Sequence, residues 1–157
     1  MSQGNVGRPV PKRRVFIAGG TGLVGRELVA VRLERGAEVV VGSRRPRPPV
    51  PGLSFVVWDP ATDPAPAGEV QRCDVVYNLI GETIGASRWS RAKRPKLLRS
   101  RVDSTAKIVA AFGGRTTTFV NASAVSAYPG DGVEHDEAEP VPWPEAASFI
   151  TTMTHAW

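Results

Sequence analysis

The chain has 157 residues, which is room for one domain. Its 41% hydrophobic and 22% charged residues can support a packed core, so a disordered, collagen-like or coiled-coil protein is excluded. No apolar run approaches the roughly 20 residues of a membrane-spanning helix, and one cysteine and two histidines exclude an internal disulfide and cysteine-based or histidine-rich metal sites. The formal charge of +5, from 20 basic and 15 acidic side chains, suits nucleic acid or a phosphate-rich small ligand as a partner.

Residues 1–13 form a basic leader, which we expect to be flexible, and no acidic residue precedes Glu27. The leader lacks the apolar segment of a secretory signal peptide. A basic leader of this kind suits either an organelle-targeting peptide, with a mitochondrial location, or a plain disordered tail on a cytoplasmic protein. We favour the disordered tail, and both readings are intracellular.

Strand and helix patterns alternate along the chain between clusters of proline, which interrupts both kinds of element. We predict strands at Arg14–Ala18, Glu38–Gly42, Ser54–Trp58, Asp74–Ile80 and Thr117–Ala122, and helices at Leu23–Arg35, Pro95–Phe112 and Pro144–Trp157. Glycines at 36, 113 and 114 are expected to end the first two helices. The residues expected to face the core are Val24, Leu28, Val31 and Leu33 in the first helix, and Leu98, Val102, Thr105, Ile108, Val109 and Phe112 in the second.

Continuous runs of valine and isoleucine, rather than alternating ones, indicate strands that are buried on both faces. With helices between them, they predict an α/β fold with a doubly wound parallel sheet, the Rossmann fold. The last predicted helix is still running at Trp157, so we expect 14–157 to be an incomplete Rossmann domain, truncated before its substrate lobe. The sheet edge at Thr117–Ala122 would then need a cover, either the rest of the fold or a protein partner.

A glycine motif joins the first predicted strand to the first predicted helix, with Gly19, Gly22 and Gly25 in G-x-x-G-x-x-G spacing. In a dinucleotide site, one glycine makes the tight turn, one lets the backbone approach a pyrophosphate, and one lets the helix pack close to the strand. The helix N-terminus then offers free N–H groups to the phosphates. The motif therefore predicts a dinucleotide site, and the alternative is a tight turn without a ligand.

The second predicted strand ends in the sequence Gly42-Ser43-Arg44-Arg45, at the place where a site for NAD carries an acidic residue for the ribose 2′-hydroxyl. No acidic residue is present here, and a guanidinium can make two parallel contacts to a 2′-phosphate. The pattern favours NADP over NAD, with a solvated turn charge as the alternative. Asp59, after the third strand, is a candidate to bind the adenine amino group.

An ordered set of motifs resembles the short-chain dehydrogenase/reductase superfamily, and more closely its atypical epimerase-family branch, whose members include sugar-epimerase-like and cell-division-inhibitor-like proteins. The motifs are GGTGLVG at 19–25, SRRP at 43–46, WDP at 58–60, NLIGE at 78–82, RWS at 88–90, SR at 100–101, and SAV at 123–125 followed by Tyr128. The resemblance covers about 14–157. It implies an NADP(H)-binding Rossmann fold with strand order 3-2-1-4-5, in a protein that continues about as far again with a substrate-binding lobe.

The resemblance also implies residue roles. A pyrophosphate loop would be lined by Gly19, Thr21, Gly22, Leu23 and Val24, with Gly25 behind it; Ser43 and Arg44 would take the ribose phosphate; and Asn78, Leu79, Ile80 and Gly81 would lie beside the adenine and ribose. Ser123 would stand where a hydroxyl polarises a substrate carbonyl. The activity implied is that of an oxidoreductase or epimerase of unknown substrate.

One departure from the superfamily concerns its catalytic Tyr-x-x-x-Lys pair, which corresponds here to Phe149 and Met153. Neither side chain can transfer a proton, which general acid–base catalysis requires. Tyr128 could take the place of the tyrosine, or could pack on the nicotinamide side. Two hypotheses therefore stay open: an atypical NADP(H)-dependent reductase or epimerase acting through Ser123 and Tyr128, and a catalytically degenerate subunit, a pseudoenzyme, of a larger assembly.

The segment from Arg88 to Arg101 carries seven basic side chains and no acidic one. Such a cluster suits RNA or an acidic partner, or the phosphate of a substrate. It also suits a solvated face that includes structural positions of the family, and we favour this last interpretation. Nucleic acid is therefore a secondary expectation.

Overall fold

The computed structural model describes residues 12–86, 88–115, 117–128, 132–136, 138–140 and 148–157. Most of the leader, 1–11, and the first part of the last predicted helix, up to residue 147, lie outside the described residues. None of the helices in the described part of the chain is long and apolar enough to cross a membrane.

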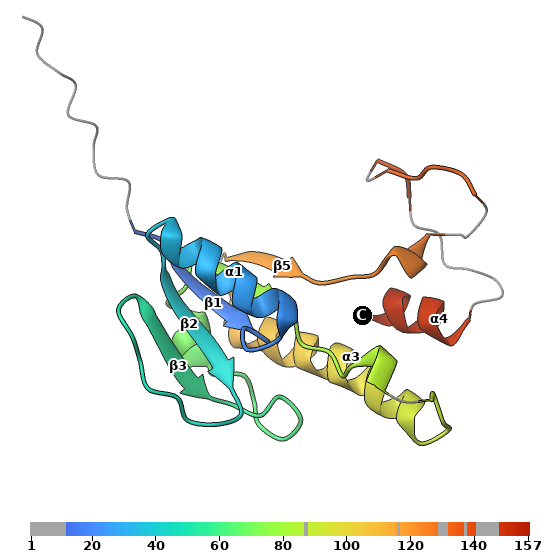
Figure 1. Cartoon of the computed structure of the whole chain (residues 1–157), viewed down its shortest axis with the longest axis horizontal. Coiled ribbons are helices and arrows are strands. Elements are labelled where there is room, and N and C mark those ends of the chain that lie inside the picture. Colours follow the sequence, from blue (N-terminus) through green and yellow to red (C-terminus); the bar gives the residue numbers. More distant parts are fainter. Residues whose placement is uncertain (1–11, 87, 116, 129–131, 137, 141–147) are drawn as a thin grey trace, which may run out of the picture.

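Five parallel strands form one sheet in the order β3-β2-β1-β4-β5, which confirms the fold class and the strand order (Figure 1). The strands are β1 (Arg14–Ala18), β2 (Glu38–Ser43), β3 (Leu53–Val57), β4 (Val75–Asn78) and β5 (Thr118–Asn121). The first matches its predicted range, β2 is one residue longer, β3 lies one residue earlier, and β4 and β5 are shorter at both ends. The central strand β1 and its two neighbours, β2 and β4, contain most of the buried valines, as the continuous apolar runs predicted.

Helices cover both faces of the sheet. Successive side chains of a strand point to opposite faces, so each strand contributes residues to two separate cores. Val15 and Ile17 of β1 share one core with Val29 of α1 (Leu23–Glu34). Phe16 and Ala18 face the other core, which is closed by α2 (Ala67–Val70) and α3 (Lys93–Ala111). The result is a three-layer sandwich, with the sheet between the helices.

The predicted buried faces of two helices need correction. In α1, Val24 and Val31 are exposed, and Gly25 and Val29 are buried in their place. In α3 the buried side chains are those of Leu97, Arg101, Ser104, Ile108 and Ala111; Val109 is exposed, and the other predicted core positions are half-buried. The face of α3 is rotated by about one residue because it contains two polar side chains, those of Arg101 and Ser104, which each donate a hydrogen bond to a carbonyl of the helix. A pattern of apolar residues does not reveal such positions.

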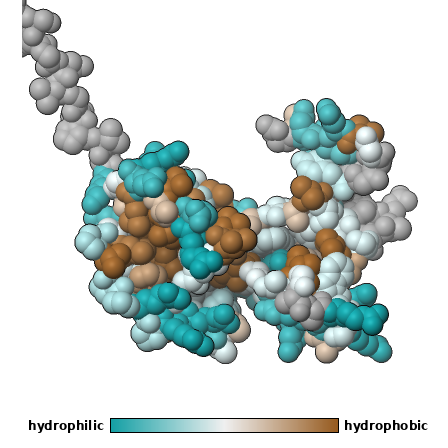
Figure 2. Space-filling view, in the orientation of Figure 1, coloured by the Kyte–Doolittle hydropathy of each residue, from teal (hydrophilic) through white to brown (hydrophobic). Residues whose placement is uncertain are grey.

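The short helical elements were not predicted, and the last helix was predicted only in part. The short helix α2 and the 3-10 turns η1 (Ile84–Ala86) and η2 (Val125–Ala127) lie in segments for which neither a helix nor a strand was predicted. The last helix, α4 (Phe149–Ala156), is capped by Ser148, whose hydroxyl accepts a hydrogen bond from the Thr151 N–H. It packs against α3 and η2 (Figure 1). Figure 2 shows an indentation between the part of the molecule that contains the sheet and α1 and the part that contains α4.

Candidate dinucleotide-binding site

The predicted cofactor residues lie at one edge of the sheet. The glycine turn follows β1, Ser43 and Arg44 stand at the end of β2, and 78–81 continue from β4. Because all five strands are parallel, their carboxyl ends meet at this edge, where open α/β sheets bind ligands.

The turn after β1 requires glycine at its first position. Gly19 has a φ of +83°, in the left-handed region that favours glycine, and its carbonyl accepts a 3.0 Å hydrogen bond from the Gly22 N–H. A Cβ at Gly19 would lie 2.9 Å from the backbone carbon and oxygen of Leu79. The turn is therefore pressed against the segment that follows β4.

The remaining glycines of the motif differ in their surroundings. A Cβ at Gly25 would lie 2.2 Å from the Gly19 oxygen, so this glycine allows α1 to pack directly on the turn. A Cβ at Gly20 would lie 2.8 Å from the side chain of Val41, so this glycine lets the turn pack closely against β2. The spacing of the motif did not predict this role, although the Gly19-Gly20 doublet is visible in the sequence. A Cβ at Gly22 would meet only the Gly19 oxygen, at 3.2 Å. Gly22 thus faces largely open space.

The N-terminus of α1 offers hydrogen-bond donors at the same place. Gly22 is the capping residue and has no side chain to bond the first turn, which also lacks an acidic residue. The first bond of the helix ladder runs from the Arg26 N–H to the Gly22 carbonyl, so the N–H groups of 23–25 precede the ladder. Leu23 and Val24 are exposed beside them. Together with the positive end of the helix dipole, these donors suit an anion.

The two predicted phosphate residues at the end of β2 are not equivalent. Ser43 is buried, and its hydroxyl donates a 2.9 Å hydrogen bond to the Arg45 carbonyl, so it shapes the turn. Arg44 is exposed and forms no ion pair with any other described residue. Its charge, like that of the equally exposed Arg45, remains available to a ligand at this position.

Asp59 holds a turn of its own. Its Oδ1 accepts a 3.0 Å hydrogen bond from the Ala61 N–H, and its own N–H donates to Oδ2 of Asp63. The Lys107 ammonium of α3 donates to the neighbouring Pro60 carbonyl at 2.7 Å. These contacts fix the chain after β3 at the ligand-binding edge, and they use one oxygen of the carboxylate proposed for adenine.

At the end of β4, Asn78 is fully buried and joins three elements. Its Nδ2 donates to Thr105 Oγ1 of α3 and to Asn121 Oδ1 of β5, both at 2.8 Å, and its Oδ1 accepts from the Ile80 N–H. Leu79 and Ile80 are half-buried and pack against opposite cores. The Asn78 side chain therefore positions the segment 79–81, and what this segment presents to the binding edge is chiefly backbone.

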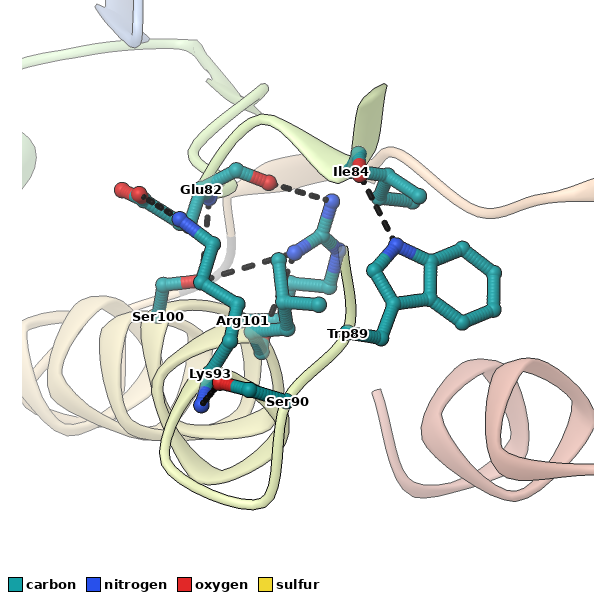
Figure 3. Close-up of polar contacts among 8 residues, drawn as sticks. Glu82, Ile84, Trp89, Ser90, Lys93, Ser100 and Arg101 are labelled. Atoms are coloured by element: carbon teal, nitrogen blue, oxygen red, sulfur yellow. Dashed lines mark hydrogen bonds and ion pairs between the residues drawn. The ribbon is translucent and has the colours of Figure 1, made fainter. Parts of the chain in front are cut away.

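A polar network fixes the loop that begins at Gly81 (Figure 3). Arg101 is only 6% exposed, and its guanidinium donates to the Leu97 and Glu82 carbonyls at 3.0 and 3.2 Å. A Cβ at Gly81 would lie 2.9 Å from the guanidinium carbon. Burial lowers the pKa of Arg101, and the Glu82 charge partly offsets that effect. The guanidinium carbon also lies 5.1 Å from the centre of the ring of Trp157, the residue that follows α4, so one side chain joins the loop, α3 and the C-terminal end of α4.

Glu82 completes this network. Its N–H donates to Ser100 Oγ at 3.0 Å, and its Oε1 pairs with the Lys93 ammonium at 2.5 Å (Figure 3). The hydrogen bond and charge of Lys93 are the main reasons that the pKa of the Glu82 carboxyl lies below its ordinary value; the charges of Arg44 and Lys96 act in the same direction. Neither Glu82 nor Lys93 was assigned a role from the sequence, although both stand in the segments NLIGE and Arg88–Arg101.

The basic segment therefore divides into two sets. Lys93 is paired with Glu82, and Arg101 is buried. The other five basic side chains, those of Arg88, Arg91, Arg94, Lys96 and Arg99, are exposed on the loop and the first turns of α3. This division agrees with a solvated face that includes structural positions.

The predicted catalytic residues are not joined by a hydrogen bond among the described residues. Ser123 is exposed two residues after β5, at the binding edge. The Tyr128 hydroxyl donates to the Asp136 carbonyl at 3.3 Å, and its ring stacks on His135 at 5.4 Å. In this arrangement Tyr128 is engaged by the segment 132–136.

The positions that correspond to the Tyr-x-x-x-Lys pair serve packing. Met153 is buried, and the Phe149 ring lies 6.3 Å from that of Trp89 and 5.3 Å from the Arg94 guanidinium carbon. Trp89 is itself held by a 2.9 Å hydrogen bond from its Nε1 to the Ile84 carbonyl (Figure 3). These side chains, with Arg91, Pro95 and Leu98, line an open groove of about 580 Å³. Among the described residues, no group of three or more His, Cys, Asp or Glu side chains could hold a metal ion.

Comparison with known proteins assigns the chain to a family. Residues 15–150 match the model of the NAD dependent epimerase/dehydratase family. The chain belongs to this family. The bovine epimerase family protein SDR39U1 is 33% identical over 133 residues, which are 81% of this chain and 42% of the bovine protein.

Solved structures agree with this assignment. The human epimerase family protein SDR39U1 (isoform 2), whose crystal structure contains NADPH, superposes with a TM-score of 0.71 and 30% identity over 92% of this chain and 47% of its own. MoeE5 in complex with UDP-glucuronic acid and NAD superposes with a TM-score of 0.71 and 26% identity over 91% and 46%. This chain thus spans less than half the length of these relatives. The family and the Rossmann fold are confirmed, whereas the relatives differ in the cofactor that they bind.

Proposed function

We propose that this chain binds NADP(H) and forms the cofactor-binding part of an oxidoreductase or epimerase. The observation that carries the proposal is the exposed Arg44 at the end of β2, which forms no ion pair with another described residue. It stands on the same sheet edge as a glycine turn and a helix N-terminus that is capped by no side chain. The human relative with NADPH supports this choice of nucleotide.

Each part of the site has a physical role in this proposal. The N–H groups at the start of α1 would bind the pyrophosphate, and the absence of a side chain at Gly22 leaves room for its approach. Arg44 would hold the 2′-phosphate with charge-assisted hydrogen bonds. The backbone of 79–81 would lie beside the adenosine. NADP(H) supplies the hydride chemistry, and Ser123 would hydrogen-bond a substrate carbonyl.

A specific observation favours a second candidate function, that of a subunit without catalysis. Met153 is buried in the core and Phe149 packs against Trp89, so α4 presents no proton donor at the two positions used by the superfamily. The Tyr128 hydroxyl, the replacement considered above, already donates to the Asp136 carbonyl. In that case the chain would retain nucleotide binding and serve a larger assembly.

Calorimetric titration of the purified chain with NADPH and NADH tests the nucleotide proposal. Charge-assisted contacts of about 1.5–3 kcal/mol at the 2′-phosphate predict that NADPH binds about 10- to 150-fold more tightly. Arg44→Ala should remove this preference, and Arg45→Ala is the matched control. Equal affinities in the wild type would contradict the choice of NADP. Oxidation of NADPH with a panel of carbonyl compounds then separates the enzyme from the non-catalytic subunit.

A further inference from the structure

An open groove of about 580 Å³ lies where the loop before α3, the first turns of α3 and the start of α4 meet. Its apolar lining comes from Trp89, Pro95, Leu98 and Phe149. Trp89, Leu98 and Phe149 are only half-buried, so part of each apolar side chain remains accessible. Sites for small molecules have volumes of roughly 300–1,000 Å³ and combine an apolar, partly aromatic lining with a few polar groups. The groove has the size and the lining of such a site.

The lining of the groove is held in place by contacts within the protein. The Trp89 ring is fixed by the 2.9 Å hydrogen bond from its Nε1 to the Ile84 carbonyl (Figure 3), and it lies 6.3 Å from the Phe149 ring. The Arg94 guanidinium carbon lies 5.3 Å from the centre of the Phe149 ring. A guanidinium stacked on a ring in this way is oriented by cation–π attraction and still offers its N–H groups to a ligand. The aromatic and cationic parts of the groove are therefore preformed.

The charge of the groove has no counterpart in the described part of the chain. Arg91 and Arg94 line it, both side chains are exposed, and neither forms an ion pair with a described residue. The segment 83–102 contains no acidic residue, and the preceding Glu82 is already paired with Lys93. Two guanidiniums beside an apolar wall are complementary to a ligand that joins an anionic group to an apolar body.

We propose that this groove is a binding site for a small organic anion, a carboxylate or phosphate carried by an apolar chain or ring. The anionic group accepts hydrogen bonds from the guanidiniums of Arg91 and Arg94, and the apolar part lies against Trp89 and Leu98. The site goes beyond the proposed function, because its lining shares no residue with the proposed dinucleotide site. It also distinguishes Arg91 and Arg94 from the other exposed basic side chains of the segment from Arg88 to Arg101, which do not line the groove.

Calorimetric titration of the chain with 4-phenylbutyrate and with its neutral amide, 4-phenylbutyramide, tests the site. The two probes share the apolar part and differ in charge, and their affinity ratio on one variant cancels any change in the fraction of folded protein. The wild type should bind the carboxylate about tenfold more tightly, as expected for one charge-assisted hydrogen bond. The double variant Arg91→Gln with Arg94→Gln should bind both probes within about twofold of each other. Arg99→Gln, which removes the same charge from α3 outside the groove, is the matched control and should keep the wild-type ratio.

Trp89→Leu should weaken both probes and leave their ratio unchanged, because it shortens the apolar wall and keeps the two guanidiniums. Equal wild-type affinities for the two probes would overturn the inference, as would an equal loss of the ratio in Arg99→Gln, which would mean that net charge alone matters. Displacement of 4-phenylbutyrate by a ten-nucleotide oligouridylate would assign the groove to nucleic acid and overturn it too. The double variant should bind NADPH as tightly as the wild type, and a clear loss would place these arginines in the dinucleotide site instead.

Discussion

Two glycines of one turn should respond to substitution in opposite ways, because only one of them faces the protein. A Cβ at Gly25 would lie 2.2 Å from the Gly19 oxygen and 2.7 Å from the Gly20 Cα, and neither backbone atom can move without opening the turn. Gly25→Ala should therefore lower the free energy of unfolding by about 3 kcal/mol or more. At Gly22, φ is −77° and ψ is 180°, a conformation open to any residue, and the only close atom is at 3.2 Å. Gly22→Val should change the stability by about 1 kcal/mol or less.

The same comparison separates folding from binding. Gly22→Val fills the space in front of the first N–H groups of α1, and loss of two hydrogen bonds to a pyrophosphate, at about 1.5–3 kcal/mol each, corresponds to an affinity loss of about 100-fold or more. Thermal unfolding by circular dichroism and calorimetric titration with NADPH, on both variants, measure the two effects. A folded Gly22→Val protein with wild-type affinity would show that the motif is only a turn. A Gly25→Ala protein as stable as the wild type would refute the packing argument.

Three further predictions concern buried and paired groups. Asn78→Leu should lower the free energy of unfolding by about 2–4 kcal/mol, because Thr105, Asn121 and the Ile80 N–H each lose their hydrogen bond to Asn78. Thr105→Val removes only one of the bonds of Asn78 and should lower it by about 1 kcal/mol. Equal losses in chemical denaturation of the two variants would contradict the network. The pKa of Glu82 is lowered in the folded chain, so its ionised carboxylate stabilises the fold. The stability that wild type has over Glu82→Gln should be fully present above pH 4.5 and should vanish as the pH falls through the lowered pKa. A stability difference that grows on acidification would contradict this sign. Burial raises the pKa of the Cys73 thiol to about 11. Native protein at pH 8 should therefore react with iodoacetamide far more slowly than protein in denaturant, because the thiolate is the reactive form. Equal rates would show that the thiol is accessible.

The parts of the fold that the sequence predicted correctly are those whose signals are local. Both ends of the apolar strand β1 were predicted correctly, because its apolar run ends in two glycines. Gly36, Gly113 and Gly114, each with a positive φ, follow the ends of their helices as predicted. The strand order came with the family resemblance, because no local pattern determines which strands pair. The errors in α1 and α3 arose where the buried face contains Gly25, Arg101 and Ser104, whose burial depends on tertiary contacts that no apolar periodicity encodes.

The candidate site shows the same division between local and tertiary information. The glycine spacing and the arginine after β2 could be predicted because each requirement concerns a single segment. The sequence also named Ser43, Asp59 and Asn78 as cofactor residues, but the structure engages their side chains with the protein itself: Ser43 with Arg45, Asp59 with Ala61, and Asn78 with two neighbouring elements. A residue at the correct place along the chain can thus serve the site by holding its backbone rather than by contacting the ligand.

Arg101 shows how far such indirect roles extend. Its guanidinium is buried, yet no described carboxylate lies within ion-pair distance, and its hydrogen bonds go to carbonyl groups and to the Ser100 hydroxyl. A buried charge of this kind is costly unless its donors are used. The two terminal nitrogens donate to the Leu97 and Glu82 carbonyls, whereas Nε is buried without a hydrogen-bond partner among the described residues, and the ring of Trp157 covers the guanidinium. The loop that carries Glu82 and the helix that replaces the catalytic pair are therefore fixed by the same cation. Trp157, at the end of α4, and the Glu82 carbonyl, near the edge where we place the cofactor, therefore contact the same guanidinium.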